Sequence, residues 1–236
     1  MATFDLTDVL AISLFLFAWA FYNWLTTASP WSRQGLSAAM NAQRRRWMQV
    51  ALGRDLRMID TAIMAGLQQG TGFFASSCIF AIGGCFALLG SSERIAEIAA
   101  DLPFYGRLDR GLVEAKLLGL VVIFAYAFFK FGWAYRLFNY CTILIGAIPM
   151  RADAEREPER AKRAVMAAAT MNQLAAKHFN AGLRGIFFGI AYLGWFLGPY
   201  VLVVTTLLVM VILAHRQFFS AARYAVSEPF EEMESR

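Results

Sequence analysis

The sequence predicts an all-α polytopic membrane protein with four transmembrane helices and additional amphipathic helices on the cytoplasmic side. Three stretches contain no Asp, Glu, Lys or Arg, namely 9–32, 61–92 and 185–215. A fourth apolar stretch covers 112–150 and contains only four charged residues, Glu114, Lys116, Lys130 and Arg136. A transmembrane helix needs about 20 mainly apolar residues, so each stretch is long enough. Charged residues make up 17% of the chain, against about 25% in soluble domains, which also favours a membrane protein.

The first half of the chain contains two of the predicted transmembrane helices. Residues 6–27 form the first, with tryptophan and tyrosine near its inner end, as in an aromatic belt. Ser29 and Pro30 end this helix. Residues 32–60 are basic and carry apolar residues at helical spacing, which predicts an amphipathic helix on the inner leaflet. The second transmembrane helix covers 62–90, longer than the bilayer requires, and an outer loop follows at 91–111.

The second half of the chain is less regular. A third transmembrane helix covers 112–136, and its apolar continuation 137–150 is re-entrant, interfacial or part of one long helix. A cytoplasmic helix covers 158–180, with Pro158 in its first turn. The fourth transmembrane helix covers 183–214, with a kink or break expected at Pro199, and 215–236 is a solvated tail. The cytoplasmic helix carries a stripe that needs a partner helix: Ala164, Ala168, Met171, Ala175 and His178.

The distribution of Lys and Arg predicts the orientation in the membrane. Basic residues concentrate in the first and third connections and are few in the second connection and the tail. The positive-inside rule therefore places the first and third connections in the cytoplasm and both termini outside. No basic residue precedes the first apolar stretch, so we expect it to be retained as a helix and not cleaved as a signal peptide.

Cations near the inner face lack acidic neighbours in the sequence. No acidic residue lies between Glu114 and Asp153 or between Glu159 and Glu228. A buried cation without a partner is costly, so these groups must reach water, lipid phosphate, an anionic ligand or a distant acid. We expect Asp60 to be that acid, paired with one of three cations: Lys130, Arg136 or Arg184. The alternative is that the cations extend to lipid headgroups.

Two sets of candidate residues emerge from this pattern. A polar and basic cluster at the inner face comprises Arg57, Asp60, Lys130, Arg136, Asn139, His178, Asn180 and Arg184. A headgroup-binding run comprises Arg44, Arg45, Arg46 and Trp47. This run is short and lies next to lipid, so we expect it to bind anionic headgroups and not nucleic acid.

Motifs for catalysis or metal binding are missing from the sequence. The only histidines are His178 and His215, and neither has a second ligand at metal-site spacing. Cys78, Cys85 and Cys141 fall in apolar stretches, also without such spacing. We therefore predict no enzymatic activity, no metal and no cofactor.

Four segments carry a family resemblance. They are RMIDTAIMAGL from Arg57, FFASS at 73–77, FFKFGWAYRLFNYCTILIGAIP at 128–149 and HFNAGLRGIFF at 178–188. Together they resemble the domain-of-unknown-function 599 family of bacterial integral membrane proteins. Ala181 and Gly185-Ile186 depart from the pattern. The resemblance implies a four-helix protein of the bacterial inner (cytoplasmic) membrane with no assigned activity.

Two functions remain open from the sequence. The first is a homo-oligomeric channel or transporter-like protein with a basic inner vestibule for anions or anionic lipid. The alternative is a non-catalytic scaffold or accessory subunit that binds a partner membrane protein through its cytoplasmic helices. The expected partners are membrane lipids, a second copy of the chain or another membrane protein, and no nucleic acid.

Overall fold

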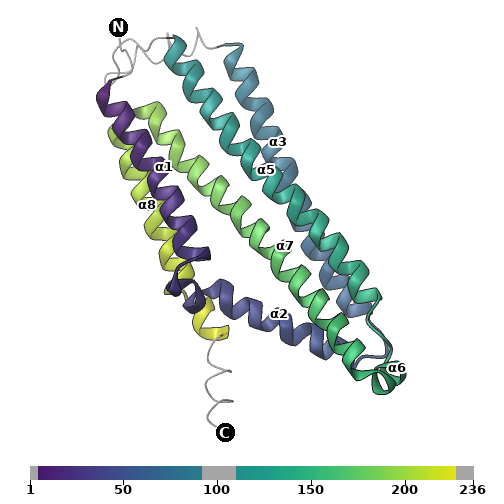
Figure 1. Cartoon of the computed structure of the whole chain (residues 1–236). Helices are drawn as coiled ribbons and strands as arrows, with labels where there is room; N and C mark the ends of the chain where they lie inside the picture. The colour runs from purple at the N-terminus through teal and green to yellow at the C-terminus, as the bar shows by residue number, and fades with distance from the viewer. Residues whose placement is uncertain (1–4, 92–109, 227–236) are drawn as a thin grey trace.

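The computed structural model describes residues 5–91 and 110–226, and within these ranges the chain is helical, with no strand. The long helices run roughly along one axis, and α2 crosses this axis near the end of α1 (Figure 1). The elements in chain order are α1 (Leu6–Thr27), the 3-10 helix η1 (Pro30–Gln34), α2 (Leu36–Leu52), α3 (Met58–Leu89), α5 (Arg110–Gly146), α6 (Arg151–Arg156), α7 (Pro158–Leu193), the 3-10 helix η2 (Gly194–Leu197) and α8 (Pro199–Phe218).

Four helices are long and apolar enough to cross a membrane, which agrees with the predicted class of multi-pass membrane protein. They are α1, α3, α5 and the segment 199–226 that begins with α8. The bounds of α1 are those predicted. With 32 and 37 residues, α3 and α5 are about 48 and 55 Å long, well beyond a bilayer core of about 30 Å. They therefore continue past the end of α1, and α2 packs against α7 along this extension (Figure 1).

Three predicted boundaries are corrected by the structure. Because α5 is unbroken to Gly146, the apolar continuation 137–150 is mostly the end of a long helix. The predicted helix 32–60 is divided into η1, α2 and a connection before α3 begins at Met58. The predicted helix 158–180 continues as α7 to Leu193. Most of the predicted outer loop 91–111, and the tail beyond residue 226, lie outside the described residues.

The predicted fourth helix 183–214 is wrong, because the chain reverses in its middle. Gly198 has a φ of 129°, a conformation that favours glycine, and Pro199 then begins α8 without needing a backbone N–H partner. The break expected at Pro199 is therefore present, but it separates two helices that form a hairpin.

As a result, α8 runs in the same direction as α1. Trp195 Nε1, just before α8, donates to Asp8 Oδ1 near the start of α1 at 2.6 Å. Gln217, at the end of α8, accepts from Ser37 Oγ just after α1 at 3.2 Å. The described chain thus begins and ends at opposite ends of the molecule (Figure 1), whereas the sequence predicts both termini on one side of the membrane.

Buried polar contacts fix the hairpin turn. Lys116 of α5 is 3% exposed, and its Nζ donates to the Trp195 carbonyl at 2.8 Å. The same ammonium lies 5.0 Å from the centroid of the Trp195 ring, within cation–π range. Together with the bond from Trp195 to Asp8, these contacts hold the turn against both α1 and α5.

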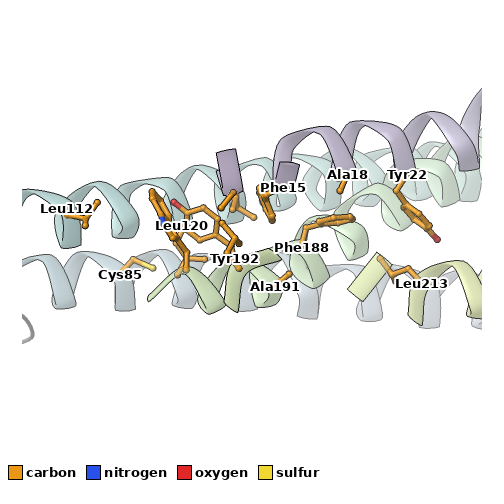
Figure 2. Close-up of a cluster of buried hydrophobic side chains, with 14 residues drawn as sticks. Phe15, Ala18, Tyr22, Cys85, Leu112, Leu120, Phe188, Ala191, Tyr192 and Leu213 are labelled. Carbon is orange, nitrogen blue, oxygen red and sulfur yellow. The ribbon is translucent and has the colours of Figure 1, made fainter. Parts of the chain in front are cut away.

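One buried hydrophobic cluster joins α1, α5, α7 and α8, with members such as Phe15, Leu120, Phe188 and Leu202. Phe15 is 1% exposed and meets Phe188 and Tyr192 edge-on at centroid distances of 5.9 and 5.5 Å (Figure 2). Such edge-to-face pairs are favourable beyond the area they bury. They fix the position of α1 over the second half of α7.

The stripe on α7 finds its partners within the chain. Ala168 and Ala175 are fully buried in a cluster with Met48 of α2 and Phe138 of α5. His178, at the end of the stripe, lies edge-on to the Trp133 ring at 6.4 Å. The partner helices that the sequence required are therefore α2 and α5.

Glycine allows α5 and α7 to approach closely. A Cβ on Gly182 would lie 2.8 Å from the ring of Phe131, which is fully buried and cannot move aside cheaply. Gly185 and Gly189 also face α5, whereas a Cβ on Gly66 of α3 would meet nothing within 4 Å.

We expect Gly182→Ala to lower the free energy of unfolding by about 1–3 kcal/mol, because it overpacks the contact with Phe131. Equilibrium unfolding in mixed detergent micelles measures this change. The matched control is Gly132→Ala in α5, where an added Cβ would also meet nothing within 4 Å. It should be neutral or slightly stabilising, since Ala favours a helix more than Gly does. Equal effects of the two substitutions would contradict the packing.

Candidate anion-binding site

Two adjoining cavities lie where α1 ends and α2, α7 and α8 meet. Their volumes are about 350 and 300 Å³, and Ser37, Asn180 and Arg184 line both. We refer to the two together as the basic pocket. Five cations line it: Arg33, Arg44, Lys177, Arg184 and Arg216. Among the described residues, no Asp or Glu lines either cavity.

The middle of α7 provides the polar wall of the basic pocket. Gln173, Lys177, Asn180 and Arg184 are spaced four, three and four residues apart, so they share one face of the helix. Another face of α7 carries the small residues that pack against α5. The sequence of α7 thus divides the helix between a core face and a pocket face.

The first half of α2 provides the second wall. Ser37, Asn41 and Arg44 are again spaced four and three residues apart. Gln173 Nε2 of α7 donates to the Asn41 carbonyl at 2.9 Å and ties the two walls together. Arg44 donates to the side-chain oxygen of Asn41 at 3.1 Å.

The ends of α1 and α8 complete the pocket. Thr26 and Thr27 come from the last turn of α1, and their hydroxyls donate to the Tyr22 and Asn23 carbonyls at 2.9 and 2.6 Å. Gln217 of α8 packs over Gly35, and its Nε2 is buried without a hydrogen-bond partner in the described part of the chain. This amide is a donor that an anion could use.

The cations of the basic pocket have neutral neighbours. Arg184 Nε donates to Asn23 Oδ1 at 2.8 Å, and the Arg216 guanidinium lies 5.6 Å from the Phe187 ring centroid. The ion pairs that the structure shows between described residues do not involve any of the five cations. Burial lowers the pKa of the Arg44 guanidinium from its ordinary value, because no opposite charge offsets the lost hydration.

Only part of the predicted inner cluster reaches the basic pocket. Asn180 and Arg184 line it, as does Arg44 from the predicted headgroup-binding run. Arg45 and Arg46 are exposed on α2. Trp47 faces α3, where its Nε1 donates to Asp60 at 2.6 Å.

The predicted residues of α5 make contacts elsewhere. The Lys130 ammonium lies 5.3 Å from the Tyr126 ring centroid, and Arg136 Nε donates to the Tyr140 hydroxyl at 2.6 Å. Asn139 accepts from Gln68 of α3 at 2.8 Å. The structure therefore does not gather these three residues with Asn180 and Arg184 around one cavity.

Asp60 is buried and paired, but with a different cation from those predicted. Its carboxylate is fully buried and accepts from Arg54 as well as from Trp47. The predicted pairing with Lys130, Arg136 or Arg184 is wrong, because the connection from α2 folds back and brings Arg54 to the first turn of α3. Asp60 therefore holds α2 in place and does not line the pocket.

Arg57 closes the end of α5. Its guanidinium donates to the carbonyls of Ile145, Ile148 and Pro149 at 3.3, 2.5 and 2.7 Å. Carbonyls at a helix C-terminus lack helical partners and attract a cation. Arg57 is thus a capping residue and not a pocket residue.

Arg57→Ala is expected to lower the free energy of unfolding by about 1.5–3 kcal/mol, since it removes charged hydrogen bonds to these carbonyls. Arg57→Lys should recover part of the loss, because one ammonium cannot span all three acceptors. Thermal unfolding in detergent reports both effects. An unchanged midpoint for the alanine variant would rule out the capping role.

Three pocket cations are absent from the residues predicted by sequence: Arg33, Lys177 and Arg216. The spacing of Lys177 relative to Asn180 and Arg184 was a usable signal, because it places all three on one helical face. Arg216 could not be found in this way, because its position depends on the reversal before α8.

Comparison with known proteins gives a family but no activity. A family model described as "Protein of unknown function, DUF599" matches residues 10–222, most of the chain. No curated protein and no solved structure matches the chain. Any functional assignment therefore rests on the geometry of the molecule.

Proposed function

We propose that this chain, which belongs to the DUF599 family of proteins of unknown function, is a membrane protein that binds a phosphate-bearing anion in the basic pocket. The observation that carries the proposal is the set of five cations lining one pocket where no described acid is present. A bound anion would supply the missing charge. Phosphate oxygens also accept hydrogen bonds from arginine guanidinium groups, hydroxyls and side-chain amides.

The pocket faces the cytoplasm in this proposal. The reversal at Gly198 brings Arg216 to the same end of the molecule as Arg44 and Lys177. The difference in the number of Lys and Arg residues between the pocket end of the molecule and the opposite end is therefore larger than in the topology predicted from sequence. The positive-inside rule then supports a cytoplasmic position for this end.

The direct test is a calorimetric titration of detergent-purified protein with glycerol 1-phosphate. We expect one saturable site whose affinity falls as salt rises, because added ions screen the cations. Uncharged glycerol should not bind. Absence of saturable phosphate binding at low salt would overturn the proposal.

We further propose that the protein lets the bound anion cross the membrane, as a transporter-like homo-oligomer. Gly66 and Gly70 of α3 have open space around them and could pack against a second copy of the chain, which favours a homo-oligomer. Vesicles containing the protein should then release a trapped phosphate monoester faster than empty vesicles. Release at the rate of empty vesicles would limit the function to binding.

The scaffold alternative loses its main support. It relied on two surfaces for a protein partner, the α7 stripe and the run from Arg44 to Trp47. The stripe packs against α2 and α5 of the same chain, Arg44 lines the basic pocket, and Trp47 donates to Asp60. The stripe is therefore not available to a foreign helix.

A further inference from the structure

An apolar groove of about 550 Å³ lies between α1 and α5, over α7. Its walls are aromatic and aliphatic side chains, including Phe15, Trp19, Val122 and Tyr126. Among the described residues, Asn23 is the one side-chain amide that lines it. Most of the groove is therefore suited to hydrocarbon and not to a soluble ligand.

The groove and the basic pocket adjoin along one face of α1. Ile12, Leu16, Trp19 and Asn23 line the groove, and Thr26 and Thr27, one turn further on, line the basic pocket. The spacings of four and three residues keep these side chains on the same side of the helix. This face therefore changes from apolar to polar at Asn23.

Asn23 also connects the two spaces chemically. Its side-chain oxygen accepts from Arg184 Nε at 2.8 Å, and Arg184 lines both cavities of the basic pocket. The Arg184 guanidinium thus lies where the hydrocarbon groove meets the polar pocket.

The length of the groove fits one leaflet. Ile12 and Asn23 are separated by eleven residues of helix, about 17 Å, against about 15 Å for half of a bilayer core. Asn23 lies one turn before the end of α1, at the depth where headgroups begin.

We propose that one anionic glycerophospholipid of the inner leaflet occupies both spaces, with its phosphate at Arg184 and one acyl chain in the groove between α1 and α5. This inference rests on the proposed function and names its ligand class. A zwitterionic lipid fits less well, because no described acid in the pocket could pair with its amine. A free phosphate monoester would leave the groove empty.

The test is native mass spectrometry of protein extracted from bilayers of equal phosphatidylglycerol and phosphatidylcholine. We expect one retained phosphatidylglycerol per chain, favoured over phosphatidylcholine by about tenfold or more, because the choline cation would lie among the pocket cations with no described acid to pair with. Equal retention of the two lipids would overturn the inference.

Filling the groove separates this inference from the proposed function. Ala20 lines the groove, and Ala20→Phe should reduce lipid retention by about tenfold or more, because several acyl methylenes lose their contacts. After removal of bound lipid from both proteins, binding of glycerol 1-phosphate should be the same in this variant as in the wild type. The matched control is Leu10→Phe, which adds a ring to a 60% exposed position outside the groove lining and should retain lipid normally.

Val122→Trp is a second groove-filling variant, on α5 instead of α1. It keeps the test decisive if Ala20→Phe does not fold. Normal lipid retention in a folded groove-filled variant would contradict the acyl site and leave phosphate binding standing. Failure of the wild-type protein to bind glycerol 1-phosphate would instead refute the proposed function.

Discussion

Replacing Asp60 by alanine is expected to lower the free energy of unfolding by about 2–4 kcal/mol, among the largest effects of any single substitution in this protein. Asp60 is fully buried in the first turn of α3 and accepts from Trp47 and Arg54. The alanine variant leaves the Trp47 N–H without an acceptor and the Arg54 charge without its partner. It also removes a negative charge from a helix N-terminus, where such a charge is favourable.

Two variants show which property of Asp60 matters. Asp60→Asn keeps an acceptor for Trp47 and loses the charge, so it should show an intermediate loss. Asp55→Ala removes the same charge from an exposed position nearby and should change stability little. Steric trapping in bicelles measures the free energy of unfolding for all three. Equal stability of the Asp60→Ala and Asp55→Ala variants would show that the buried pair is not stabilising.

Replacing Arg184 by glutamine is expected to weaken binding of glycerol 1-phosphate by about 10- to 100-fold, the range for loss of one charged hydrogen-bonding partner. Arg184 lines both cavities of the basic pocket, and its neighbour Asn23 is neutral. Its charge is therefore available to a ligand. Glutamine is shorter, but its amide nitrogen takes the place of Arg184 Nε as a donor to Asn23, so α7 should fold normally.

The matched control for Arg184 is Arg45→Gln. Arg45 is exposed on α2 and does not line the pocket, yet its replacement changes the net charge by the same amount. Calorimetric titration at low salt should show near wild-type affinity for this variant. If both substitutions weakened binding equally, the effect would come from overall charge and not from the pocket.

The helical class and the ends of α1 could be predicted because they depend on local composition. An uncharged stretch bounded by Asp8 and Arg33 admits one membrane-length helix, and Ser29-Pro30 ends it. Local composition did not predict the structure of 183–214 correctly. An apolar stretch with a central Pro199 is compatible both with one kinked helix and with two helices that form a hairpin.

The outcome for that stretch depends on contacts distant in sequence. Lys116 and Asp8 hold Trp195 at the turn, and neither is near it in the chain. Composition therefore could not reveal the reversal, and the predicted separation of Arg216 from Arg44 was wrong as a consequence. The partner of Asp60 was missed for a related reason, because it depends on how the connection after α2 folds back.

The candidate site was predicted in part. Arg184 and Asn180 could be selected because they are polar groups near apolar segments without acidic neighbours. Arg44 could be selected because it lies in a basic run on a predicted interfacial helix. Lys130 and Arg136 meet the same criterion, yet the rings that they contact are Tyr126 and Tyr140. Sequence spacing gives the face of a single helix, but which faces of different helices meet is decided by packing.

The most direct test of the account is an experimental structure of the protein in a bilayer that contains phosphatidylglycerol. We expect phosphate density within hydrogen-bond distance of Arg184, inside the basic pocket formed by α1, α2, α7 and α8. An empty pocket, with ordered headgroups only beside exposed residues such as Arg45 and Arg46, would contradict it.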